Sequence, residues 1–273
     1  MRVIWQMAYR LLKRGLVVLI ALVAGIALFE FIQAVVVDSL GGPEGLTSLL
    51  ESLPPALQAF TRTQPEFMAM SGLAGYLSLG FTHPLYLILT AAGVVGFGYR
   101  TLAGEMELGT IQLSLSRPIA RPRVFASRML GVILIAIVLS VTGALGLLLG
   151  LLFAQPQGEF VYSHLVPTAA ISGALLWAIG GLTLLGSSAA STNGRALAWA
   201  IAVLIVSYFV DYFASIWRPL ETIQFLSIYH YFDPASTLVL GQMPWRDIGI
   251  LLAVGGAGAL AGLIIFTQRD LPT

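Results

Sequence analysis

Six long apolar stretches alternate with shorter polar or proline-containing segments along this chain. They cover residues 15–37, 85–103, 129–153, 166–190, 196–215 and 248–267. Each provides about the 20 mostly apolar residues that an α-helix needs to cross a bilayer, where the backbone must satisfy its own hydrogen bonds. The pattern therefore predicts an all-α polytopic membrane protein, with six transmembrane helices in a single transmembrane domain over residues 15–273.

The first 14 residues follow a different pattern. Arg2, Arg10, Lys13 and Arg14 lie on one side of a helical wheel, and apolar residues lie on the other. This predicts an amphipathic helix in the cytoplasmic interface of the membrane; the alternative is that these cations are only the positive flank of the first span. The first span is longer than the roughly 7–15 residues of a cleaved signal core, so we expect it to stay attached.

The basic residues are distributed unevenly between the two sides of the predicted spans. Of the 14 Lys and Arg, all but Arg62, Arg218 and Arg246 lie on the same side as the N-terminus. Because Lys and Arg are retained preferentially in cytoplasmic loops, we expect both chain ends in the cytoplasm, with the protein in a bacterial inner membrane. The outer segments are then 38–84 and 216–247.

The outer segments carry helix-breaking residues. Segment 38–84 contains the pair Pro54 and Pro55 and predicts short helices at the membrane surface. Segment 216–247 is rich in aromatic residues and prolines, which predicts a broken helix that dips into the outer leaflet.

Composition excludes several kinds of chemistry. Only 10% of the residues are charged against 58% apolar, the net charge is +1, and cysteine is absent, which argues against a nucleic-acid binder and a thiol enzyme. The only lysine is Lys13, so no glycine-rich loop ending in Lys is present to bind ATP phosphates. His83, His164 and His230 lie far apart in sequence, in three different outer loops, and we expect them to be solvated. The sequence predicts no catalytic residue and no metal site.

Two features of the spans bear on packing and transport. Small residues recur at helical spacing in the third, fourth and sixth spans, which predicts close contacts between helices of the same chain; these residues are Gly143, Gly146, Gly150, Gly180, Gly181, Gly255, Gly258 and Gly262. Glu30 is an acidic residue near the outer end of the first span. It is a candidate for contact with a cationic substrate in the pathway, or alternatively its side chain extends to the membrane surface.

The segment between the second and third spans, 104–125, carries the highest density of charge. Glu105 and Glu107 come first, and arginines follow within about a dozen residues. Gly109 and Pro118 interrupt what would otherwise be one helix. We therefore expect a short helix across the ends of the spans that offers charges to a cytoplasmic partner.

The residues of this segment resemble the signature of ABC-2 type permeases. The run Ala-Gly-Glu-Met-Glu-Leu-Gly-Thr (103–110), followed by Leu-Ser-Arg-Pro-Ile-Ala-Arg (115–121), is similar to the acidic pair before Gly-Thr and the later Pro-x-x-Arg element of that family. The resemblance implies an ATPase-coupling region formed by Glu105, Glu107, Gly109, Thr110, Arg117, Pro118 and Arg121. Met106 departs from the family, where many relatives carry another Glu.

The resemblance also implies a mechanism. Two six-helix permease subunits, identical or closely related, would form a translocation pathway for export. A separate cytoplasmic ATPase dimer would bind ATP and Mg. No cofactor is then expected in this chain. A second contact with the ATPase could come from the turn at 191–195, or this is a plain turn. The alternatives for function are a permease-like subunit that transmits force to a periplasmic partner, and an ATP-independent secondary transporter.

Overall fold

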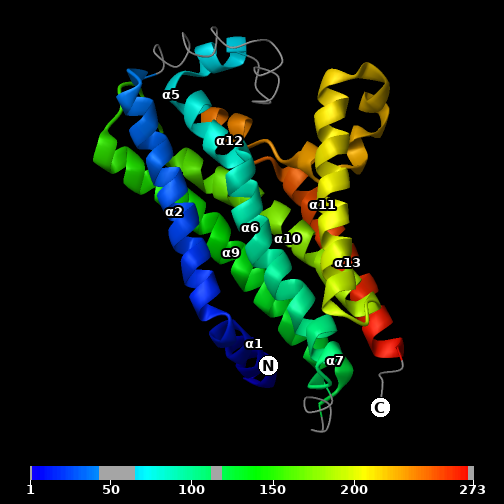
Figure 1. The fold of residues 1–273 in the computed structure, drawn as a ribbon. Helices are drawn as coiled ribbons and strands as arrows, with labels where there is room; N and C mark the ends of the chain where they lie inside the picture. Colours follow the sequence, from blue (N-terminus) through cyan, green and yellow to red (C-terminus); the bar gives the residue numbers. More distant parts are fainter. Residues whose placement is uncertain (1, 43–64, 112–118, 270–273) are drawn as a thin grey trace.

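The computed structural model describes residues 2–42, 65–111 and 119–269 and folds as an elongated bundle of helices (Figure 1). Within these ranges, six helices are long and apolar enough to cross a membrane. They are α2 (Leu16–Ser39), α6 (Pro84–Tyr99) with its extension η1 (Arg100–Gly104) and α7 (Glu105–Glu107), α9 (Arg121–Ala154), α10 (Leu165–Ala189) with η2 (Tyr162–His164) before it, α11 (Asn193–Ile216) and α13 (Trp245–Gln268). The predicted all-α fold with six spans is confirmed.

Basic residues gather at one end of the bundle. Helix α1 (Arg2–Arg14), α7 and the last turn of α13 all lie at this end (Figure 1). We call it the basic end; its described cations include Arg10, Lys13, Arg100, Arg121, Arg123, Arg128, Arg195 and Arg269. Helix α5 (Pro65–Thr82), η3 (Arg218–Leu226), η4 (Tyr229–Tyr231) and α12 (Pro234–Leu240) lie towards the opposite end. The side of the membrane that the basic end faces remains a prediction.

Helix α10 occupies the middle of the bundle and packs closely on α13 through glycines. A Cβ atom built on Gly181 would come within 2.0 Å of the Gly255 carbonyl oxygen, and one on Gly258 within 2.8 Å of the Gly181 carbonyl carbon. Only glycine allows backbones to approach this closely, which is how helices gain packing energy in lipid. The prediction that these glycines mediate contacts within the chain is confirmed.

Helices α9 and α2 also pack closely through glycines. A Cβ on Gly146 would lie 2.5 Å from the Ala27 carbonyl oxygen, and one on Gly150 would lie 2.6 Å from the Phe31 carbonyl oxygen. The backbones of α9 and α2 are therefore in direct contact along the half of α9 that lies away from the basic end. The remaining surface of α2 is largely exposed and apolar, as expected for a helix at the edge of the bundle.

The structure corrects the description of segment 38–84. Its helix α5 bends at Gly72 (φ 56°, ψ −145°), and the part after the bend buries Leu73, Leu77 and Phe81 in the core. These residues are spaced four apart and so form one apolar stripe, which packs inside the bundle instead of lying on the membrane surface. Pro54 and Pro55 lie outside the described residues.

Segment 216–247 forms the broken helix that was predicted. The helices η3, η4 and α12 are separated by short breaks, and Tyr229, Phe232 and Leu238 are buried against the bundle. His164 was expected to be solvated, but its ring is bonded to α12: its Nδ1 lies 2.8 Å from the carbonyl oxygen of Leu238. His83 also has a structural role: its Nδ1 accepts from the Leu85 amide (3.1 Å) at the start of α6.

Candidate functional site

A buried arginine holds the start of the predicted coupling segment. Arg128, in the second turn of α9, donates through Nη2 to both carboxylate oxygens of Glu105, at 3.0 and 2.7 Å. Its side chain is only 2% exposed. A charge-assisted contact to both oxygens fixes direction as well as distance. Arg128 was expected only as one of the topological cations, because 23 residues separate it from Glu105 and nothing in the linear pattern pairs them.

The second carboxylate of the segment binds the neighbouring turn. Glu107 is exposed, and its Oε2 accepts a hydrogen bond from the backbone amide of Asn193 (2.7 Å). Asn193 is the first residue of α11, where free amides and the helix dipole favour a negative charge. The turn at 191–195 is therefore tied to α7 and is more than a plain connection.

The end of α6 widens into a π-helical turn at η1, and Ser187 of α10 accounts for it. In an α-helix the Ala103 amide would donate to the Tyr99 carbonyl. Instead, the Ser187 hydroxyl accepts from the Ala103 amide (3.0 Å) and donates to the Tyr99 carbonyl (3.1 Å). A side chain inserted in this way opens the helix by one residue and fixes α6 to α10.

Two further arginines donate hydrogen bonds to the carbonyl oxygens at the C-terminal ends of α10 and α13. Arg269 Nη1 lies within 3.0 Å of three carbonyl oxygens at the end of α10, those of Ser188, Ala189 and Ala190. Arg121, at the start of α9, donates through Nη1 to the carbonyl oxygens of Thr267 (3.3 Å) and Arg269 (2.7 Å). Carbonyls at a helix C-terminus lack intrahelical partners, so cations are favourable here.

Together these contacts form a closed network across the basic end. We call it the basic-end network; its members are Glu105, Glu107, Arg121, Arg128, Ser187, Asn193 and Arg269. It runs from α9 through α7 to α11, and from α10 through α13 back to α9. Polar contacts therefore connect α7 to α9 and α11, and the adjoining η1 to α10.

The tip of the coupling segment is exposed. Gly109 adopts a positive φ of 67°, which ends α7 and favours glycine, and the Thr110 hydroxyl donates weakly back to the Glu105 carbonyl (3.4 Å). Leu108 is 75% exposed although it is apolar; the sequence reading did not single it out. Helix α9 begins at Arg121, so the last part of the expected loop 104–125 is helix. Arg117 and Pro118 lie outside the described residues.

Glu30 does not reach the membrane surface. Its side chain is fully buried, and neither carboxylate oxygen has a hydrogen-bond partner among the residues that the structure describes. The oxygen Oε2 faces α5, where a Cβ on Gly80 would come within 2.5 Å of it. The alternative in which Glu30 extends to solvent is therefore wrong, while a role in the pathway remains a prediction.

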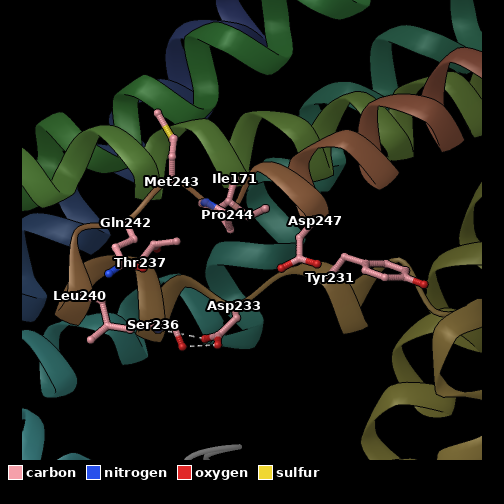
Figure 2. A pocket seen from close by; sticks show the side chains of 10 residues that line it. All are labelled: Ile171, Tyr231, Asp233, Ser236, Thr237, Leu240, Gln242, Met243, Pro244 and Asp247. Atoms are coloured by element: carbon pink, nitrogen blue, oxygen red, sulfur yellow. Dashed lines mark hydrogen bonds between the residues drawn. The ribbon is translucent and has the colours of Figure 1, made fainter.

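The described part of the bundle contains two notable hollows, one towards each end. The first, of about 480 Å³, lies between the α1–α2 elbow and α6, and includes Arg100 and Glu105 at its basic end. The second, of about 240 Å³, lies at the opposite end between α10, α12 and the start of α13 (Figure 2). In the second, Asp233 caps α12 through the Ser236 amide, so this carboxylate already has a structural role. Neither hollow includes Glu30.

Comparison with known proteins identifies the family. The family described as "ABC-2 family transporter protein" matches residues 55–271, a range that includes five of the six spans and the whole basic-end network. A search of the curated proteins finds no match. This coverage, together with the six apolar helices, shows that the chain is a multi-pass membrane permease that belongs to the ABC-2 transporter family.

Proposed function

We propose that this chain is the membrane-spanning subunit of an ATP-driven exporter in the bacterial inner membrane. In this proposal two copies, or one copy and a close paralogue, form the pathway, and a separate ATPase dimer binds ATP and Mg. Membership of the ABC-2 family supports a partnership with such an ATPase. The concentration of cations at the basic end supports its placement in the cytoplasm.

The basic-end network is the observation that carries this proposal. A motor subunit can drive a permease only if its movement reaches the spans. Helix α7 is bonded to α9 by Glu105 and to α11 by Glu107, and the adjoining η1 is bonded to α10 by Ser187. A push on α7 would shift α9 and α10 as levers between two packings of the bundle.

The exposed tip is the surface that we assign to the ATPase. Glu105 and Glu107 are both engaged within the chain, so their role in coupling is to position the segment. Leu108, Gly109 and Thr110 face outwards, and an exposed leucine at a turn suits a hydrophobic contact with a partner. Arg117, Pro118 and Arg121 keep their proposed place in the coupling region.

The test is to reconstitute the permease in liposomes with its cognate ABC ATPase and to measure the stimulation of ATP hydrolysis by the permease. Leu108→Asp should reduce hydrolysis to the rate of the ATPase alone, because a charge replaces the apolar contact. Leu226→Asp, at the opposite end and 67% exposed, is the matched control and should preserve the stimulation. If Leu108→Asp stimulates ATP hydrolysis as strongly as Leu226→Asp does, the tip does not contact the ATPase.

The absence of native cysteine makes orientation directly measurable. Leu108→Cys should react with a membrane-impermeant maleimide in inverted vesicles and not in intact cells. Reaction in intact cells would place the basic end outside and overturn the proposal. Transport by the purified permease in liposomes that contain no ATPase would instead favour a secondary transporter.

A further inference from the structure

The hollow near α1 has the chemistry of a lipid site. Its walls are formed by apolar residues of α1, α2 and α6, among them Leu12, Leu19 and Phe97. Its volume of about 480 Å³ falls within the roughly 300–1,000 Å³ of pockets that hold a small-molecule ligand, which are also mostly apolar with few polar groups. We call it the α2–α6 groove.

The groove opens on a surface at the depth of the spans. Val18 of α2 is 57% exposed, Ala92 of α6 is exposed, and a Cβ on Gly96 would meet no atom within 4 Å. These residues belong to two membrane-spanning helices, so the open side faces hydrocarbon. A lipid chain enters such a site without crossing water.

Positive charge lies at the basic end of the groove. Arg100 is exposed, and its Nε donates to the Tyr99 hydroxyl (2.9 Å), with the guanidinium carbon 5.4 Å from the Tyr99 ring centre. This hydrogen bond does not use the two terminal nitrogens. Arg10 and Lys13, both exposed, flank Leu11 and Leu12 of the groove wall in sequence.

The carboxylate in the groove does not oppose an anion. Glu105 lines the same hollow, but both of its oxygens are bound by Arg128, which compensates its charge. The groove therefore combines an apolar channel with a cation at the membrane boundary, the arrangement in which basic pockets between transmembrane helices bind anionic lipid head groups.

We propose that the α2–α6 groove binds an anionic phospholipid of the leaflet at the basic end, with an acyl chain along α6 and the phosphate at Arg100. The groove shares Leu108 and Thr110 with the exposed tip that we assign to the ATPase. Lipid retention requires neither ATP nor a motor subunit, so it can be measured on the permease alone, and the result does not depend on the coupling proposal.

The test uses the purified permease and native mass spectrometry, with phosphatidylglycerol and phosphatidylcholine of identical acyl chains. Wild type should retain phosphatidylglycerol preferentially. Gly96→Leu places a side chain in the groove at a position where the new Cβ meets no atom within 4 Å, and it should abolish retention. Arg100→Gln should lower the preference for phosphatidylglycerol about fivefold, the equivalent of about 1 kcal/mol for one cation near the membrane surface.

Matched controls separate the site from general changes in charge or surface. Gly256→Leu makes the same substitution on α13, where a Cβ also meets no atom within 4 Å, and Arg123→Gln removes another exposed arginine at the basic end. Both should retain lipid as wild type does. Equal retention of the two lipids by wild type, or full retention by Gly96→Leu, would overturn the proposal. So would a disulfide between two copies of Gly96→Cys, because a second copy would then cover the groove.

Discussion

Arg128 of α9 grips both carboxylate oxygens of Glu105 from a position where only 2% of its side chain is exposed. This contact fixes the start of segment 104–125, which the sequence predicts to be a loop, to the third span. The burial of this ion pair makes it sensitive to single substitutions, because removing either side chain leaves the opposite charge uncompensated.

Arg128→Met should therefore destabilise the protein strongly. Removing one partner of a buried ion pair costs about 3–5 kcal/mol, because the other charge is left without compensation. The double variant Glu105→Gln, Arg128→Met should recover much of this loss. The measurement is the thermal unfolding midpoint of the purified protein, with the exposed Arg123→Met as control. Additive losses in the double variant would show that the two side chains do not depend on each other.

Ser187→Ala should loosen the junction between α6 and α7. The variant removes the hydroxyl that bridges the Ala103 amide and the Tyr99 carbonyl, so the amides of η1 should exchange hydrogen faster. Ser188→Ala is the matched control, since the Ser188 hydroxyl donates only within its own helix, to Leu184. The measurement is the rate of amide hydrogen exchange over residues 99–107, followed by mass spectrometry. Identical rates in the two variants would contradict the bridging role of Ser187.

Gly181→Ala should disrupt the contact between α10 and α13. The added methyl would overlap the Gly255 backbone, which cannot move aside as a flexible side chain can. Overpacking of this kind costs typically about 1–3 kcal/mol, so the unfolding midpoint should fall. Gly249→Ala, where the new Cβ meets nothing within 4 Å, should leave the midpoint unchanged or raise it slightly through better helix propensity.

Glu30→Met should preserve or increase stability. It removes two buried oxygens that lack hydrogen-bond partners, and an unsatisfied buried polar group costs about 1–3 kcal/mol. Transport measured on the same variant then tests the predicted pathway role. A lower unfolding midpoint would show that Glu30 stabilises the bundle, whereas an intact midpoint with lost transport would place Glu30 in the pathway.

The sequence alone determined the number of spans, because the need to satisfy the backbone in lipid leaves a long apolar signal for each helix. It also indicated which glycines mediate close packing, since small residues at helical spacing have few other uses in a span. The family could be identified from the run at 103–110 because that motif is local in the chain.

Only the tertiary structure decided how the basic end is connected. Glu105 with Arg128, Glu107 with Asn193 and Arg269 with the end of α10 are pairs separated by 23, 86 and about 80 residues, and hydrophobic periodicity carries no information about partners at such distances. The burial of Glu30 was hidden for the same reason: the position of a carboxylate along a span does not reveal that α5 folds back against it. Long-range polar contacts depend on the way helices pack, and packing is a property of all the spans together.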